Sequence, residues 1–170
     1  FHRTIITTGG SPNGRGLQYV AQLGHDIEPP VPSLFTFNIK DRAFCDLMGT
    51  VVEPVVTTIP RTKLRAKGPL LVTHWGVSGP AVLKLSSYAA RLLAENDYKA
   101  PLAISWTGEL TRQEVEENLL KLQTANPRKQ VATLHPFGLP SRLWLYILSK
   151  LDIDAVKPWA EIGRKTLNRM

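Results

Sequence analysis

One stretch of the chain places a histidine and a serine at a spacing that could do chemistry. Residues 73–80 read Thr-His-Trp-Gly-Val-Ser-Gly-Pro, so His74 and Ser78 lie close in sequence. A serine activated by a histidine base can act as a nucleophile in acyl transfer. The hydrolase elbow requires Gly-x-Ser-x-Gly, and Pro80 stands where its last glycine would be. The pattern therefore favours Ser78 as the N-cap of a helix that starts at Pro80, and His74 as a structural hydrogen-bonding residue.

Metal ligation and disulfide formation find little support in the sequence. The four histidines, His2, His25, His74 and His135, are far apart and show no ligand spacing. Cys45 is the single cysteine, which excludes an internal disulfide and a cysteine-based zinc site. We therefore expect no metal site, and a reducing, cytoplasmic setting.

The chain opens with a glycine-rich turn between two predicted elements. Residues 3–8 are β-rich, residues 9–16 contain four glycines, and residues 17–23 predict a short helix that ends at Gly24. Glycines between a strand and a helix can hold a phosphate on free backbone amides. The dinucleotide fingerprint is absent, because Tyr19 stands where the third glycine should be. Taken alone, the pattern favours a plain turn.

Hydrophobic periodicity divides the rest of the chain into a strand-rich and a helix-rich part. Period-two or β-branched patterns predict strands within residues 34–39, 51–59, 62–66, 70–73 and 99–107, with turns at 68–69 and 76–79. A helical stripe runs from Pro80 to about residue 95. Further helices are predicted after Thr111, whose Glu114 completes a capping box, and after Asn126, Pro140 and Pro158. The fold class is α+β, a small β-barrel with an attached helical subdomain.

Two boundaries follow from these patterns. The proline-rich residues 28–33 form a stiff extended connector, and Gly108 separates the last strand from the helices. The expected domains are residues 1–28, 29–108 and 109–170. The four tryptophans alternate with apolar residues, which favours core positions for all of them.

Composition sets the broad class. With 43% hydrophobic and 21% charged residues, the chain has the composition of a globular protein, and no apolar run is long enough for a membrane span. The net charge of +7 could serve nucleic acid or an anionic cofactor, but the charges do not cluster. The simpler interpretation is that the positive charge keeps the protein soluble.

Three segments together resemble one family. They are Thr-Thr-Gly-Gly at 7–10 with Leu-Gly-His at 23–25, Gly-Pro-Leu-Leu-Val-Thr-His-Trp-Gly-Val-Ser-Gly-Pro at 68–80, and Leu-Pro-Ser-Arg-Leu-Trp at 139–144. They occur in this order in the BaiN/YhiN-like flavoproteins, also described as aminoacetone-oxidase-like NAD(P)/FAD-dependent oxidoreductases. The middle segment fits that family's Thr-His-x-Gly-aliphatic-Ser-Gly-Pro motif, and the resemblance covers most of the chain.

The resemblance implies a role for the chain within a larger protein. In this family, a Rossmann-type FAD domain carries an insertion made of a small β-barrel and a helical subdomain. Residues 1–28 would then be a stub of the FAD domain, with Thr8, Gly9 and Gly10 beside the flavin nucleotide. His74 becomes the candidate to position substrate or relay a proton, and Trp75, Gly76 and Ser78 become substrate-pocket candidates. FAD, with NAD(P)H as candidate reductant, would be bound by the parent protein.

Three hypotheses stay open. The first is the insertion domain of a FAD-dependent oxidoreductase, colourless and inactive alone, whose partners are the remaining FAD domain and a small-molecule substrate. The second is a basic module that binds nucleic acid, although we expect neither nucleic acid nor a membrane as the main partner. The third is a serine hydrolase using Ser78 and His74.

Overall fold

The computed structural model describes residues 3–7, 9 and 14–170. Contacts within the chain divide it into two compact units, Phe1–Val31 and Pro32–Met170. The division falls inside the proline-rich connector that the sequence indicates. Within the second unit, we call residues 32–108 the barrel part and residues 109–170 the helical part.

The described residues of the first unit contain one helix, α1 (Arg15–Gln22). It ends as predicted at Gly24, whose φ of +88° suits a residue without a side chain. Gly24 N–H donates to the Ala21 carbonyl at 2.9 Å and His25 N–H to the Val20 carbonyl at 3.4 Å, which is the Schellman pattern. Residues 3–7 form no strand, contrary to prediction. A strand needs a partner to pair with, and in the described part of this chain none pairs with them.

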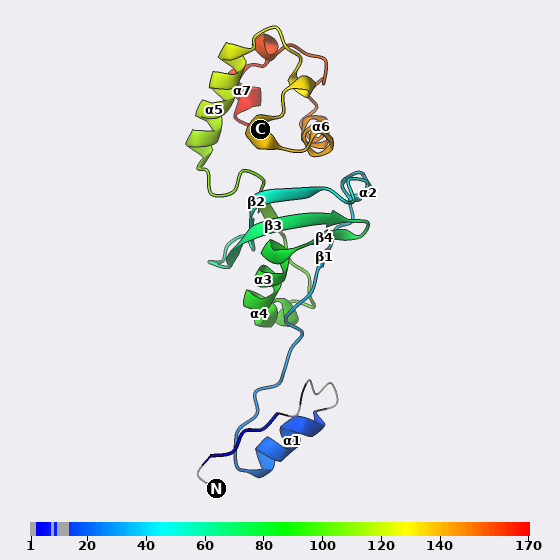
Figure 1. The fold of residues 1–170 in the computed structure, drawn as a ribbon, viewed down its shortest axis with the longest axis vertical. Coiled ribbons are helices and arrows are strands. Elements are labelled where there is room, and N and C mark those ends of the chain that lie inside the picture. Colours follow the sequence, from blue (N-terminus) through cyan, green and yellow to red (C-terminus); the bar gives the residue numbers. More distant parts are fainter. Residues whose placement is uncertain (1–2, 8, 10–13) are drawn as a thin grey trace. The chain divides into compact units, whose positions relative to one another are not determined.

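The second unit is built on a curled antiparallel sheet. Its strands are β1 (Phe37–Asn38), β2 (Val51–Thr58), β3 (Arg65–Thr73), β4 (Gly76–Ser78) and β5 (Ala103–Ser105). Their order is β1-β4-β3-β2-β5, with every neighbouring pair antiparallel (Figure 1). The α+β class with a small open barrel and attached helices is confirmed.

Two predicted turns are strands in the structure. Gly68 and Pro69 lie inside β3, where Gly68 pairs with Val55 next to a register shift in β2. Residues 76–78 form β4, because the chain reverses earlier, at His74 and Trp75. In both places the cross-strand pairing overrides the local preference of glycine and proline for turns.

Short helices complete the barrel part. They are α2 (Arg42–Cys45), α3 (Pro80–Tyr88) and α4 (Ala90–Glu95). The α3 helix is tied to the sheet by the buried Thr57 hydroxyl, which donates to the Ala81 carbonyl at 3.0 Å. Its N-cap is Gly79, one residue after the predicted Ser78, and Pro80 takes the first helical position.

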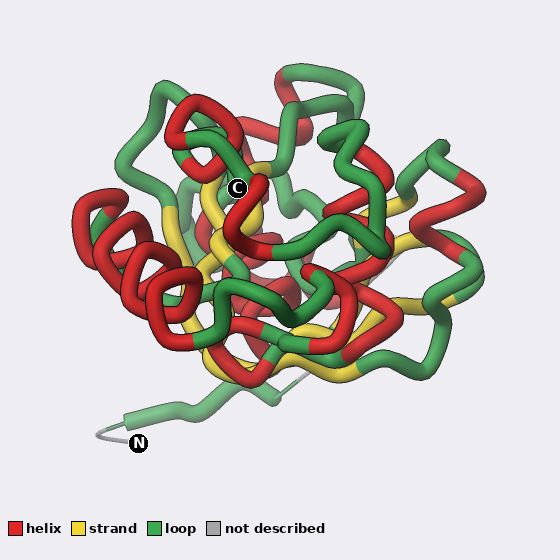
Figure 2. The backbone as a smooth tube through the Cα atoms, turned by 90° about the horizontal axis from the view of Figure 1, so that it is seen from above, coloured by secondary structure: helices red, strands yellow, loops and turns green. Residues whose placement is uncertain are grey.

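The helical part consists of short elements joined by loops, as Figure 2 shows. They are α5 (Arg112–Ala125), η1 (Val131–Thr133), η2 (Pro136–Gly138), α6 (Ser141–Lys150), η3 (Trp159–Glu161) and α7 (Arg164–Leu167). The predicted capping box is present, since Thr111 and Glu114 bond reciprocally at the start of α5. Asn126 was predicted to start a helix, but it caps the end of α5 instead.

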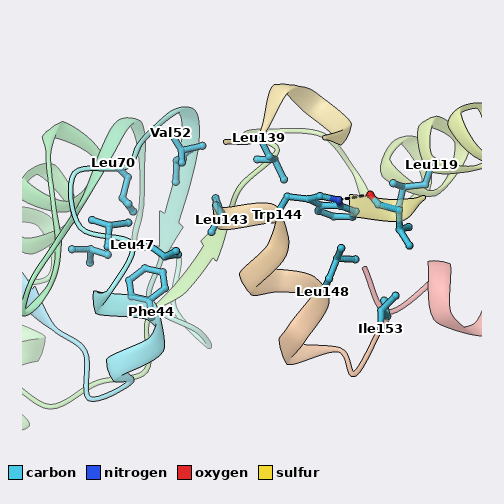
Figure 3. Close-up of a cluster of buried hydrophobic side chains, with 14 of the residues drawn as sticks. Phe44, Leu47, Val52, Leu70, Leu119, Leu139, Leu143, Trp144, Leu148 and Ile153 are labelled. Carbon is cyan, nitrogen blue, oxygen red and sulfur yellow. Dashed lines mark hydrogen bonds between the residues drawn. The ribbon is translucent and has the colours of Figure 1, made fainter. Parts of the chain in front are cut away.

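A continuous hydrophobic core joins the barrel part to the helical part. Figure 3 shows side chains of both parts in this cluster, among them Phe44, Leu47, Val52, Leu70, Leu139, Leu143, Trp144 and Leu148. The ring centroid of Phe44 lies 6.2 Å from that of Trp106 and 5.5 Å from that of Tyr146. Trp144 stacks on Trp159, with 6.3 Å between centroids. The expected boundary at residue 108 therefore lies inside one packed unit, and as a boundary of the parent protein it stays a prediction.

Polar contacts across the same junction centre on Asp41. Its carboxylate accepts from the Phe44 backbone N–H, the Tyr146 hydroxyl and the Lys150 ammonium. The Lys150 hydrogen bond is the main cause that lowers the pKa of Asp41 below its ordinary value. Burial, together with the Asp41 carboxylate, raises the pKa of Tyr146 to about 12. Arg142 adds hydrogen bonds to the backbone carbonyls of Asp46 and Met48.

Candidate functional site at the β3–β4 hairpin

The hairpin, residues 73–78, carries most of the residues singled out by the sequence. The Thr73 hydroxyl accepts a hydrogen bond from the Gly76 backbone N–H at 3.1 Å, which closes the turn from inside. On the neighbouring edge, Ile39 N–H donates to the Trp75 carbonyl at 2.8 Å. Both ends of the turn are therefore fixed by hydrogen bonds, one to the Thr73 hydroxyl and one between backbone groups, and a side chain on it has a defined position.

Two glycines of the motif are required by close backbone contacts. A Cβ on Gly76 would lie 2.2 Å from the Phe37 carbonyl oxygen, and one on Gly79 would lie 2.9 Å from the Pro69 carbonyl oxygen. Both residues also have positive φ, +151° and +98°. Gly76 was predicted as a substrate-pocket residue. The structure gives it a steric role, which brings β1 against β4.

His74 and Trp75 are the exposed residues of the turn. Their rings meet edge to face with 4.2 Å between centroids, and the Trp75 Nε1–H donates to the Thr36 hydroxyl at 3.2 Å. Trp75 is 42% exposed, so the expectation that all four tryptophans lie in the core is wrong for this one. An aromatic pair held on a fixed turn and open to solvent is suited to stacking on a planar ligand.

Ser78 is the last residue of β4 and pairs with Leu71 of β3. Its side chain is half-buried. Among the described residues, no hydrogen bond joins Ser78 to His74, and no carboxylate pairs with His74. A nucleophile, base and acid in contact are what a hydrolase needs, so the geometry gives the serine hydrolase hypothesis no support.

The motif thus separates into two groups of residues. Thr73, Gly76, Gly79 and Pro80 have evident roles in the turn, the close strand approach and the helix start. His74 and Ser78 have no comparable structural role in the described chain, which leaves them available for a ligand. The residue pattern alone favours an N-cap role for Ser78 and a structural hydrogen-bonding role for His74, and the described part of the structure shows neither.

The residues expected beside the flavin nucleotide belong to the first unit. Thr8 and Gly10 lie outside the described residues. Gly9 is exposed, has a φ of +67°, and a Cβ built on it would meet no atom within 4 Å. This open backbone is compatible with the close approach of a cofactor, which is the use that glycine has in such loops.

A groove that the sequence did not indicate lies beside β5. This cavity of about 390 Å³ is lined by residues of β5, α5, η2, α6 and α7. A second cavity of about 420 Å³ shares five of its lining residues, Trp106, Thr107, Leu110, Phe137 and Leu139. The lining of the first cavity, the groove beside β5, is spread over residues 104–170 and contains no sequence motif, so only the tertiary structure could show it.

Two kinds of feature are missing from the part of the chain that the structure describes. No three histidine, cysteine, aspartate or glutamate residues gather where they could hold one metal ion. In the same residues, no helix has the length and apolar character needed to cross a bilayer.

The chain is similar to a ribosomal RNA dihydrouridine synthase of Haemophilus influenzae, with 28% identity over 147 residues that cover 82% of this chain and 34% of the relative. It is also similar to a 3-dehydro-bile acid delta(4,6)-reductase of Clostridium scindens, with 27% identity over 101 residues, 55% of this chain and 25% of the relative. The chain thus spans about a third or less of the length of these curated relatives.

A family model described as "HI0933-like protein barrel and H2TH domain" matches residues 31–170. The match begins at the proline-rich connector and includes both the barrel part and the helical part, in agreement with the single core that joins them. The resemblance found in the sequence motifs is therefore confirmed, and the chain belongs to the HI0933-like family, with residues 31–170 forming its barrel and H2TH domain.

Proposed function

We propose that the chain is the substrate-side insertion domain of a FAD-dependent oxidoreductase, and that alone it neither holds flavin nor catalyses the reaction. The main support is the His74–Trp75 pair, which is exposed on a turn that is fixed by the hydrogen bond from Gly76 N–H to the Thr73 hydroxyl and by the close approach of β1. The family match over residues 31–170 and relatives named as a reductase and a synthase support the proposal.

In the parent protein, residues 8–10 would contact the FAD nucleotide through backbone amides. The open space around Gly9 and its positive φ support this assignment. The flavin would supply hydride or electron transfer, with NAD(P)H as candidate reductant. The remaining FAD domain would be the partner of this chain, in a cytoplasmic protein.

The His74 imidazole would position the substrate or carry a proton at the hairpin. An imidazole can donate and accept protons near neutral pH, and its ring can rest against a planar group. Trp75 would provide the adjacent stacking surface, with its Nε1–H held by Thr36. Ser78 would contribute a hydroxyl to the substrate site of the parent protein.

The test uses protein expressed from the whole reading frame that contains this chain. We expect a flavin absorption spectrum there and none for residues 1–170 alone. In the full-length protein, H74N should lower kcat and alter its pH profile, while H135N, an exposed histidine of the helical part, should match the unsubstituted protein. A flavin-free full-length protein would refute the proposal. Equal pH profiles for H74N and H135N would remove His74 from the reaction.

Nucleic acid is the second candidate partner. It is favoured by a net charge of +7, a pI near 9.8 and the relative named for ribosomal RNA. In this case the substrate of the parent would be a nucleotide within RNA. A titration with RNA should show affinity that falls steeply as salt rises, since phosphate contacts release counterions. Undetectable or salt-insensitive binding would leave the small-molecule substrate as the remaining candidate.

A further inference from the structure

The groove beside β5 has an apolar interior that the core leaves incompletely covered. Six half-buried apolar side chains that pack against the main core also line it: Ile104, Trp106, Val115, Phe137, Ile147 and Met170. Leu110, which is 40% exposed, stands at its mouth and is shared with the second cavity. Leu119, Leu139 and Trp144, labelled in Figure 3, form its deeper part. Volumes of this size are typical of small-molecule pockets.

Phe137 forms a wall common to both cavities and has an unusual backbone. Its φ is +59°, in the left-handed region that bulky residues seldom adopt. Strained positions of this kind concentrate where a side chain must be held against a ligand. Gly138, the next residue, also has a positive φ, +67°, but of the two only Phe137 carries a side chain that makes this conformation costly.

The charges around the groove favour an anion. Arg112 and Arg169 line it, and Glu116 is its single acidic lining residue. Arg164 binds Glu116, with 3.4 Å from Nε to Oε1, so that carboxylate is already paired. Arg112 donates to the Asn168 carbonyl at 3.3 Å, which is a neutral acceptor and leaves its charge uncompensated. Among the described residues, Arg169 has no ion pair.

We propose that this groove binds an amphipathic organic anion. The apolar or aromatic body would lie against Trp106 and Phe137, and a carboxylate or sulfonate would meet the guanidinium groups of Arg112 and Arg169. Guanidinium groups bind such oxyanions with two parallel hydrogen bonds. None of the lining residues belongs to the β3–β4 hairpin, so the site is additional to the proposed function and does not rest on it.

The experiment is a fluorescence titration of residues 1–170 with anilinonaphthalene sulfonate, which has an aromatic body and one sulfonate. Decanoate, an apolar chain with one carboxylate, should displace it. R112M and R169M keep most of the side-chain length without the charge, and each should weaken binding by about ten-fold, the loss of one charge-assisted hydrogen bond. R128M, an exposed cation outside the groove, is the matched control and should bind like the unsubstituted protein.

Leu110→Asp is a second variant that is safe for the fold, because the side chain is already exposed. It places a carboxylate at the mouth of the groove and should abolish binding, while the thermal midpoint stays unchanged. The proposal is refuted if R112M and R169M titrate like R128M, or if L110D binds normally. Displacement by oligouridylate at concentrations where decanoate has no effect would refute it too, in favour of single-stranded RNA.

Discussion

The β3–β4 hairpin of the second unit and the opening segment of the first unit use glycine in different ways. In the second unit, Cβ atoms on Gly76 and Gly79 would collide with backbone atoms of neighbouring strands. In the first unit, Cβ atoms on Gly9 and Gly14 would meet no atom within 4 Å, although both residues have positive φ. The glycines of the hairpin are thus explained by packing within this chain, whereas those of the opening segment are not.

The same contrast holds for apolar side chains. The buried hydrophobic residues of the described chain begin at Phe44, and none comes from the first unit. There, Ile5 is 87% exposed and Leu23 66% exposed. The second unit therefore has the core needed to fold by itself. Gly9, Gly14 and the exposed apolar side chains of the first unit are not explained by contacts within the described chain. Binding of the flavin nucleotide in the parent is the explanation that we propose.

Gly76→Ala should break the second unit and is the largest effect that we expect. The added methyl would lie far inside contact distance of the Phe37 carbonyl and of the Ile39 nitrogen at 2.7 Å, so β1 must separate from β4. We expect the free energy of unfolding to fall by at least ~4 kcal/mol, a large part of the ~5–15 kcal/mol of an ordinary domain. Urea denaturation followed by tryptophan fluorescence would measure it.

Gly163→Ala is the matched control for this change. Gly163 has a negative φ of −67°, and its Cβ would have no neighbour within 4 Å. Its urea midpoint should equal that of the unsubstituted protein. If G76A and G163A unfold alike, the steric account of the hairpin glycines is wrong.

Gly79→Ala should lower the free energy of unfolding by less, about 1–3 kcal/mol, the usual cost of overpacking. Its closest contact would be 2.9 Å, to the Pro69 carbonyl, and its φ of +98° adds strain for any residue with a Cβ. The same urea titration gives the value. If the urea midpoint of G79A were below that of G76A, the order predicted from the contact distances of 2.2 Å at Gly76 and 2.9 Å at Gly79 would be wrong.

Stability at acid pH should depend on Asp41, which links the barrel part to the helical part. Its pKa is lowered in the folded state, mainly by the Lys150 hydrogen bond, from the ordinary value of 3.8. A lowered carboxyl pKa contributes stability above the unfolded-state pKa, and this is lost as pH falls through the folded-state pKa. Asp41→Asn keeps an N-cap for α2 but removes the charge. The variant should therefore be less stable than the unsubstituted protein at neutral pH, and its stability should fall less between pH 5 and pH 2.

Thermal midpoints measured across this pH range, for D41N and for the unsubstituted protein, provide the check. D46N is the control, since Asp46 is an exposed carboxylate one turn further along that forms no ion pair among the described residues. Parallel pH curves for D41N and the unsubstituted protein would show that the junction carboxylate does not contribute.

Local signals in the sequence predicted the elements that are defined locally. The capping box of Thr111 and Glu114, the helix end at Gly24 and the β-branched strand after Val51 all appear as expected. Each depends on contacts within one turn or on side-chain preferences that a short window contains. The barrel and the helical part also followed from the change in hydrophobic period near Gly108.

Features that depend on distant partners were predicted wrongly or not at all. Gly68-Pro69 looked like a turn, but pairing with β2 holds it in β3. The motif found the His74 hairpin, yet not the Thr36 hydroxyl that holds Trp75, because the two are far apart in sequence. The groove beside β5 depends on five separate elements and has no sequence signal of its own. Only the folded chain brings such residues together.

Removal of residues 1–31 should have the smallest effect on the second unit and tests the comparison directly. Since no described residue of the first unit belongs to the buried hydrophobic core, residues 32–170 should unfold in urea with the midpoint and slope of the whole chain. Hydrogen exchange should agree, with rapid exchange of α1 amides and slow exchange in β2 and β3 of the intact chain. If the truncated protein lost its cooperative transition, the first unit would contribute to the core after all, and its glycines would need a structural explanation rather than a cofactor.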